Sequence, residues 1–402
     1  MMCKRFSMSV AAVVALCCIA SCSQRQVGNF RRDVAPGVEH IHESVAEGPW
    51  SIHVLKVDLS RRDLHWVTAL GAGHVFGLST VSEMVHLAAA SAGGRLVAAI
   101  NGDFFAIRAG DYQGDPLGIQ IMNGELVSGP RAGYGAFWMD AEGKPHMWEV
   151  ESHLRARWPG GEEVPFVLNE GRPDGGAALY SPVMGFPARN DTLFPSTRTR
   201  GGRELVLERV EGQPWLPVEV GKRISARVRE VRDAGNTPLE ADALILSLGP
   251  GLLAKTPPAP PGTVLTLIFE TTPDLSGVRC AVGGGTVLVK NGAAQYTEAG
   301  PESPRHPRTF LGWNEQHLFA FVVDGRQSGF SVGMTYAECA ALALRYGCTE
   351  ALELDGGGSS TMWVAGKVVN SPSDRGGERS VGNALILIRS KGGEPEDGGS
   401  RR

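Results

Sequence analysis

The spacing of hydrophobic residues predicts two similar helix–strand units. In the first, Thr80–Glu83 has the Thr-x-x-Glu pattern of a capping box, and the helical pattern that follows runs to about Ser91, where Gly93-Gly94 ends it. The apolar run Leu96–Ile100 has the length of a short buried strand. This strand leads directly into Asn101-Gly102-Asp103.

The second unit repeats this plan about 250 residues later. Thr335–Glu338 is again a capping box, and its helix runs to about Tyr346 and ends at Gly347. The strand Ala351–Leu354 leads into Asp355 and three glycines. Each unit therefore places a carboxylate on a glycine-containing turn at the C-terminal end of a strand, where ligands of sheet-based folds commonly bind.

Between the two units the pattern is mainly that of short strands. From residue 115 to 320, apolar runs such as Gly118–Met122 and Val264–Phe269 are separated by Gly, Pro and Asp. Upstream, Ile52–Leu59 alternates between apolar and polar residues, as expected of a half-buried strand. We therefore expect an α+β fold with large mixed β-sheets and a few helices, in which the two αβ units echo each other.

The N-terminal end has the pattern of a secretion signal. Lys4 and Arg5 precede the apolar stretch 8–20, which is too short to span a bilayer. The stretch ends in Ala20-Ser21-Cys22, which resembles the lipobox of bacterial lipoproteins. We expect cleavage after residue 21 and lipidation of Cys22.

This interpretation sets the expected domain boundaries. Residues 1–21 are the signal peptide, residues 22–45 a polar tether, and residues 46–390 the folded domain. The tail 391–402 has no apolar residue, so it is expected to be disordered. The protein is then a lipid-anchored protein of the cell envelope, and by resemblance to Gram-negative sorting, Ser23 favours the outer membrane.

The charge and cysteine content bear on the expected partners and on disulfide formation. The net charge is −4 and no block of Lys or Arg occurs, so no nucleic-acid partner is expected. Seven cysteines are present, of which three, Cys280, Cys339 and Cys348, fall in the expected domain. An odd number in an exported domain, with Cys339 and Cys348 near opposite ends of a helical pattern, favours three small buried thiols over a disulfide.

Three familiar motifs can be set aside. Gly329–Gly333 has the G-x-S-x-G pattern of a nucleophile elbow, but no strand runs directly into Ser331 and no histidine follows His317. The Gly356–Ser360 run lacks the lysine of a phosphate-binding Walker motif. No spacing demands a metal, so no cofactor is assigned, and a divalent cation among Asp103, Asp324 and Asp355 stays an open alternative.

The strongest chemical signal is the turn after the second strand. Asp355 precedes Gly356, Gly357 and Gly358, whose amides are not shielded by a Cβ, and then Ser359, Ser360 and Thr361 add hydroxyls. Such a turn suits a phosphate or sugar oxygen. A tight turn in which the aspartate caps backbone amides is the structural alternative.

Other polar residues occur where strands are expected to begin or end. Guanidinium groups can bind a phosphate with two hydrogen bonds, and amides and carboxylates complete the set. The residues concerned are Asn101, Asp103, Arg308, Asp324, Arg326, Arg379 and Asn383.

Taken together, these motifs resemble the phosphodiester glycosidase family over about residues 46–390. The resemblance is carried by several short segments, none of which is specific alone. One departure is Thr286, where family members often have proline after the glycines. The segments are Asn101–Phe105, Gly283–Gly285 with Leu288-Val289, Pro307–Thr309, Asp324–Arg326, Gly333–Glu338, Leu354–Met362, Asn370–Asp374 and Arg379–Asn383.

The resemblance implies hydrolysis of the bond between a sugar's anomeric carbon and a phosphodiester. Asp355, Asp103, Asp324 and Arg326 are then the expected catalytic set. One carboxylate acts as base or nucleophile, and the separation between the carboxylates decides which. The remaining candidates would bind substrate: Asn101, Arg308, Arg379, Asn383 and residues 356–361.

Two alternatives stay open. A non-catalytic envelope lipoprotein could use the same pocket to bind an anionic glycan. Alternatively, the same carboxylates could cleave a glycan that carries no phosphate, in which case Arg326 would matter much less than Asp355.

Overall fold

The computed structural model describes residues 28–89, 93–185, 196–298 and 304–390. The expected signal peptide, Cys22 and the tail 391–402 lie outside these residues. The described chain is mainly β, with two α-helices among the described residues, α1 (Val81–Ala89) and α2 (Tyr336–Arg345). The expected α+β class is therefore corrected to a mainly β fold, because most of the chain between the two helices pairs as strands. No helix of the described residues is long and apolar enough to cross a membrane.

The largest sheet has eight antiparallel strands. In spatial order they are β1 (Phe30–Ala35), β2 (Val38–Val45), β3 (Trp50–Asp58), β21 (His317–Val323), β20 (Arg308–Trp313), β22 (Glu350–Glu353), β18 (Val287–Lys290) and β19 (Ala293–Ala294). The expected tether of residues 22–45 is thus wrong over residues 30–45, which form β1 and β2. Its polar residues His40 and His42 are buried among strand neighbours rather than solvated.

The fold also contains two five-stranded sheets. One has the order β24 (Lys367–Val368), β23 (Met362–Val364), β5 (Gly94–Asn101), β25 (Asn383–Ser390) and β4 (Leu64–Leu70). The other has the order β7 (Glu125–Ser128), β6 (Gln120–Met122), β17 (Cys280–Gly283), β8 (Gly135–Met139) and β9 (Pro145–Glu149).

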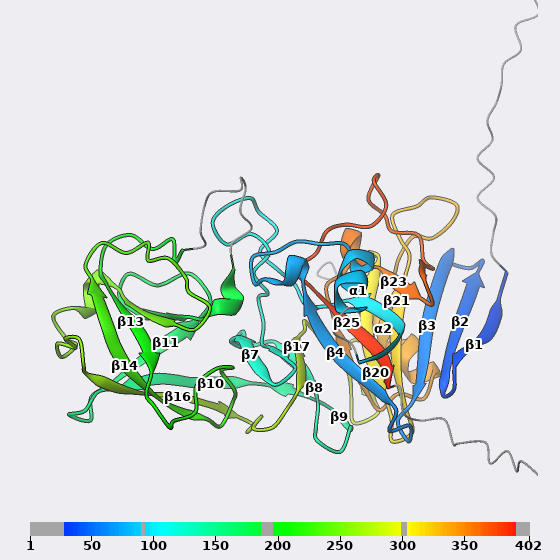
Figure 1. Cartoon of the computed structure of the whole chain (residues 1–402). Helices are drawn as coiled ribbons and strands as arrows, with labels where there is room; N and C mark the ends of the chain where they lie inside the picture. Colours follow the sequence, from blue (N-terminus) through cyan, green and yellow to red (C-terminus); the bar gives the residue numbers. More distant parts are fainter. Residues whose placement is uncertain (1–27, 90–92, 186–195, 299–303, 391–402) are drawn as a thin grey trace, which may run out of the picture.

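The remaining strands form a closed barrel. Its order is β10 (Glu151–Arg157), β11 (Glu163–Leu168), β12 (Ala177–Tyr180), β15 (Leu244–Leu248), β13 (Arg203–Arg209), β14 (Arg223–Arg232) and β16 (Val264–Thr272). These strands occupy one continuous stretch of sequence between β9 and β17. Figure 1 shows the barrel, with strands in green, on one side of the other sheets.

Away from the barrel, the hydrophobic contacts define four layers. Helix α2 packs on one face of the eight-stranded sheet through a cluster that includes Phe310, Phe321 and Ala340. The other face packs on the β5–β25 sheet, and α1 covers the far face of that second sheet. Both helices begin with the predicted capping boxes, in which Thr80 and Glu83, and Thr335 and Glu338, bond reciprocally.

The cysteines are arranged as predicted. Cys280, Cys339 and Cys348 are free and buried. Burial raises the pKa of the Cys280 thiol to about 12, so this sulfur stays protonated and serves as a small apolar side chain.

Candidate active site

The structure joins the ends of the two helix–strand units. The Asn101 side-chain amide donates to the Asp355 carbonyl at 2.6 Å, and the Asp355 amide donates to the Gly102 carbonyl at 3.0 Å. The Asn101 carbonyl oxygen accepts from the Thr361 amide at 3.1 Å and from the Thr309 hydroxyl at 2.8 Å. Asn101 is fully buried, so it positions the Asp355 turn and has no free polar atom for substrate.

Asp355 is the least buried of the three candidate aspartates. As a residue it is partly exposed, whereas Asp103 and Asp324 are 2% and 1% exposed. Burial raises the pKa of Asp355 to about 6, opposed by hydrogen bonds from the Ser359 hydroxyl and the Gly356 amide and by the charge of Arg379. A carboxyl group with such a pKa is mostly ionised at neutral pH and still able to take up a proton.

Asp103 lies close to Asp355 but faces inward. One of its carboxylate oxygens accepts from the Phe104 amide and the other from the Gly118 amide, both at 2.7 Å. It is 2% exposed, and burial together with the charge of Asp355 raises its pKa to about 8. A side chain at Gly283 would collide with this carboxylate, which accounts for the glycine there.

Asn383 also has a positioning role. Its side-chain carbonyl accepts from the Asp103 amide at 2.7 Å, and its amide donates to the Gln120 side chain at 2.8 Å. Asn383 is fully buried. Both predicted asparagines therefore hold the carboxylate-bearing turns in place.

The guanidinium groups of two arginines from other segments lie against the glycine turn. Gly357 has a φ of 64°, and a Cβ on it would lie 3.0 Å from the Arg326 guanidinium. A Cβ on Gly358 would collide with the guanidinium of Arg379. A side chain at Gly357 or Gly358 would therefore push a guanidinium group away from the turn.

The two arginines differ in what holds them. Arg379 binds the Asp374 carboxylate with two hydrogen bonds of 2.8 and 3.1 Å and approaches the Ser359 hydroxyl at 3.5 Å. Arg326 is exposed, and its guanidinium lies 3.5 Å from Nδ1 of His306. Arg326 therefore keeps most of its donors available to an anion.

The hydroxyls of the turn include two without partners. Ser360 and Thr361 are 1% and 0% exposed, and within the described residues neither hydroxyl has a hydrogen-bond partner. Gly357–Ser359 forms a single 3₁₀ turn just before them. The turn thus holds buried polar groups whose hydrogen bonds the described protein does not supply, which is unusual unless a ligand or water completes them.

Arg308, predicted to bind substrate, is instead enclosed by the protein. It is 6% exposed and donates to the Glu353 carboxylate at 2.8 Å and to the carbonyls of Met334 and Pro304 at 2.9 and 2.8 Å. Its guanidinium also lies 4.3 Å from the centre of the Tyr336 ring. These contacts leave no side preorganised for an anion.

Asp324, predicted to be catalytic, lies beneath the site. It is 1% exposed and accepts hydrogen bonds from the Asn370 side chain at 3.0 Å, the Ser371 amide at 2.8 Å and the Ser51 hydroxyl at 2.8 Å. Burial raises its pKa to about 6. The carboxylate fixes the start of the loop that carries Asp374 and Arg379, so it acts through these residues.

Ser331, which the sequence excludes as a nucleophile, links the backbones around Asp324 and Ser51. It is fully buried, donates to the Asp324 carbonyl at 2.6 Å and accepts from the Ser51 amide at 3.0 Å.

Three polar residues were not predicted. Glu353 is the buried partner of Arg308, and Asp374 holds Arg379. Asp115 is buried with one carboxylate oxygen that lacks a partner within the described residues, and burial raises its pKa to about 8. Asp374 could have been found from its place in the same loop as Arg379, whereas nothing local distinguishes Asp115.

The glycine turn therefore brings one partly exposed carboxylate, Asp355, together with the guanidinium groups of Arg326 and Arg379. No group of three or more His, Cys, Asp or Glu in the described residues is placed to hold a metal ion.

Comparison with known proteins finds a family model that matches the C-terminal segment. Residues 251–388 match the family model described as phosphodiester glycosidase, which confirms the resemblance predicted from the sequence. The segment includes Asp324, Arg326 and Asp355, whereas Asn101 and Asp103 lie outside it. One relative, the SPbeta prophage-derived uncharacterized protein YomE of Bacillus subtilis (strain 168), is 39% identical over 115 residues. The match spans 28% of this chain and 18% of that relative.

Solved structures share the fold over a larger part of the chain. A hypothetical protein from Synechocystis superposes with a TM-score of 0.68 at 18% identity, covering 91% of this chain and 64% of that one. A protein of Burkholderia pseudomallei K96243 named "Putative exported protein" superposes with a TM-score of 0.62 at 24% identity, covering 85% and 74%. At these identities the likeness shows the fold alone.

Proposed function

We propose that this protein is a hydrolase that cleaves a sugar 1-phosphodiester at the bond between the anomeric carbon and the phosphate oxygen. The observation that carries the proposal is the placement of partly exposed Asp355 beside two guanidinium groups on one glycine turn. The match of residues 251–388 to the phosphodiester glycosidase family supports it.

The anionic part of the substrate would bind to the arginines. Arg326 has free donors, and Arg379 is held in place by Asp374. Phosphate oxygens can accept from both guanidinium groups. The Gly356 and Gly357 amides already donate to the Asp355 carboxylate and the Pro307 carbonyl, so the arginines are the donors assigned to the phosphate. These contacts would neutralise the charge that the leaving phosphate gains, which is the main requirement for a fair leaving group.

The sugar would sit over Asp355. As the bond between the anomeric carbon and the phosphate oxygen breaks, positive charge develops on the anomeric carbon, and an ionised carboxylate stabilises it. The oxygen of a water molecule ends on the anomeric carbon, its proton is released, and the phosphate monoester leaves with the bonding electrons. Asp355 rather than Asp103 is assigned here, because Asp103 is 2% exposed whereas Asp355 is partly exposed.

The experiment is release of free sugar by the purified protein from a panel of sugar 1-(alkyl phosphates). Asp355→Asn should reduce the rate by about 10²-fold or more, as is usual when a positioned carboxylate is lost. Asp233→Asn, which changes an exposed carboxylate of the barrel, is the matched control and should leave the rate unchanged. Full activity of folded Asp355→Asn would reject this role.

Two further arms address the alternatives. Arg326→Ala should impair cleavage of the phosphodiester, whereas equal activity on a neutral aryl glycoside, unaffected by Arg326→Ala, would favour a glycan without phosphate. Binding of anionic glycan without sugar release would favour a non-catalytic protein.

We also propose that the protein is exported and anchored in the cell envelope through lipidated Cys22, with outer-membrane sorting. The lipobox-like sequence supports this, as does the fold shared with the Burkholderia protein named as exported. A Cys22→Ala variant expressed in a Gram-negative host should move from the membrane fraction to the soluble fraction. Retention in the membrane fraction would reject the anchor.

A further inference from the structure

A pocket lies at the opposite end of the strands that carry the candidate active site. Ser51, near the start of β3, contacts Asp324, whereas Val57, near its end, lines this pocket. Six residues of strand separate the two positions by about 20 Å at 3.3 Å per residue. The same reversal occurs in β25, where Asn383 contacts Asp103 and Ile388 lines the pocket.

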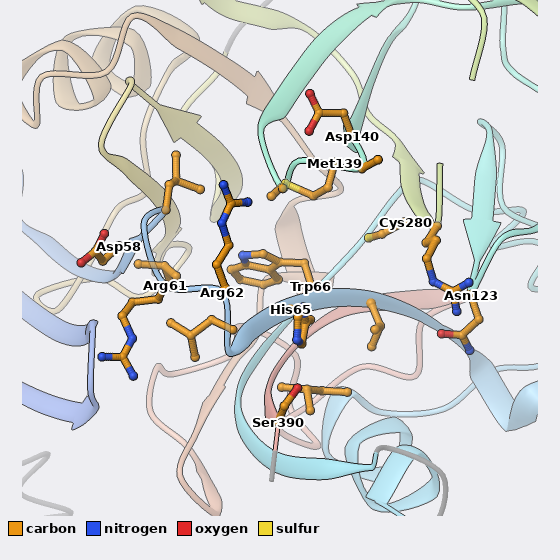
Figure 2. Close-up of a pocket in the computed structure, with 18 of the residues that line it drawn as sticks. Asp58, Arg61, Arg62, His65, Trp66, Asn123, Met139, Asp140, Cys280 and Ser390 are labelled. Carbon is orange, nitrogen blue, oxygen red and sulfur yellow. The ribbon is translucent and has the colours of Figure 1, made fainter. Parts of the chain in front are cut away.

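The pocket has the size and lining of a small-molecule site. It encloses about 600 Å³ and lies between β4, the β8–β9 hairpin and the start of β17 (Figure 2). Sites for small ligands commonly have volumes of 300–1,000 Å³ and mostly apolar walls. The apolar walls here are formed by Val57, Leu59, Leu64, Trp66, Met139 and Ile388.

One polar atom of this wall lacks a partner. Trp66 is 7% exposed, and its indole N–H has no hydrogen-bond acceptor within the described residues. Buried indole N–H groups usually find an acceptor. Because this nitrogen is itself buried, Trp66 lines the pocket through its apolar ring atoms.

The rim carries two arginines that form no ion pair within the described residues. Arg62 donates to the neutral carbonyl of Glu142, and the side chain of Arg279 has no hydrogen-bond or ion-pair partner there. The two acidic side chains of the lining are already engaged in their own turns. Asp58 accepts from the Ser60 amide, and Asp140 pairs with His146.

We propose that this pocket binds an amphipathic anion, a ligand with an apolar body and one carboxylate or phosphate head. The apolar walls, including the Trp66 ring, would take the body, and Arg62 and Arg279 would bind the head group at the rim. The proposal is independent of the chemistry at Asp355.

The test is isothermal titration of the full protein with four probes below their aggregation concentrations. Decanoate and decyl phosphate represent the two head groups, decanol lacks the charge, and inorganic phosphate lacks the apolar body. Both anionic amphiphiles, or one of them, should bind at one site at least tenfold more tightly than decanol, and inorganic phosphate alone should not bind measurably. Equal affinity for decanol would overturn the anionic part of the proposal.

Variants connect the affinity to this pocket. Arg279→Gln changes an exposed side chain, so the fold should persist, and affinity should fall about tenfold. Trp66→Phe makes the aromatic wall smaller, and affinity should fall several-fold. Arg209→Gln, on an exposed arginine of the barrel, is the control and should not change affinity. If Arg279→Gln and Trp66→Phe both bind like the unchanged protein, the pocket is not the binding site.

Discussion

Replacing Arg308 by methionine separates a structural role from a role in substrate binding. The side chain was predicted to bind substrate, but the structure encloses it between Glu353 and two backbone carbonyls. Methionine retains much of the apolar stem and removes the charge. The exchange therefore leaves Glu353, which is 3% exposed, without its cationic partner.

The expected loss of stability is large. Removing one member of a buried ion pair costs about 3–5 kcal/mol, because the remaining charge stays in a poorly solvated environment. The Met334 and Pro304 carbonyls also lose their donors. We expect Arg308→Met to lower the free energy of unfolding by about 3–5 kcal/mol, whereas removing both charges in Arg308→Met/Glu353→Met should cost less than about 2 kcal/mol.

The pH dependence supplies a second signature. Burial raises the pKa of Glu353, and the charge of Arg308 opposes this shift. Without Arg308 the pKa should rise further, so the folded state takes up a proton that the unfolded state does not hold. Stability from such a group is present at low pH and lost as the pH rises through the folded-state pKa. The variant should therefore be closest to the unchanged protein near pH 5 and weakest at pH 8.

The assay is urea-induced unfolding followed by circular dichroism at pH 5 and pH 8, together with KM for a sugar 1-phosphodiester under conditions where each variant is folded. A structural role predicts the loss of unfolding free energy and its recovery in the double variant. An unfolding free energy within about 0.5 kcal/mol of the unchanged protein, with a raised KM, would refute the structural role and restore Arg308 to the substrate-binding set.

Three further outcomes follow from the site. Gly358→Ala should displace Arg379 and raise KM about tenfold or more in steady-state kinetics. The control Gly376→Ala, whose Cβ would meet nothing within 4 Å, should leave KM unchanged. Equal KM values for the two variants would show that close contact between Arg379 and the turn is not needed. Because the Asp355 pKa is about 6, the rate of cleavage should rise with pH through about 6 if the ionised form acts, and a rate that falls there would assign the protonated form instead. Asn101→Ala removes three buried hydrogen bonds and should cost about 2–5 kcal/mol in urea unfolding; a loss below 1 kcal/mol would contradict its anchoring role.

Local sequence determined the parts of the fold that depend on near neighbours. The capping boxes at Thr80 and Thr335 are complete within four residues, so both helix starts could be predicted. The Asp355 turn could also be found, because three adjacent glycines indicate close approach of other groups whatever those groups are. The identity of those groups, Arg326 and Arg379, was suggested by the family resemblance, but their places over individual glycines were not.

Polar strands were the first feature that local pattern did not identify. Residues 30–45 look like a solvated tether, because Arg, Asp, Glu and His are frequent in them. They form strands because β2 pairs with β3 along its whole length, and buried His40 and His42 find partners in His53 and Ser51. Such partners are invisible until the strand pairing is known.

The roles of the charged residues were decided only by the tertiary structure. Asp355 and Asp103 follow similar strands, yet one is partly exposed and the other is enclosed by the Phe104 and Gly118 amides. The side chains of Arg308 and Asp324 are hydrogen-bonded to buried partners up to 273 residues away in sequence. Whether a charge faces solvent depends on which distant segments cover it, so a sequence can nominate the polar residues of a site, while packing determines which of them remain free to meet a substrate.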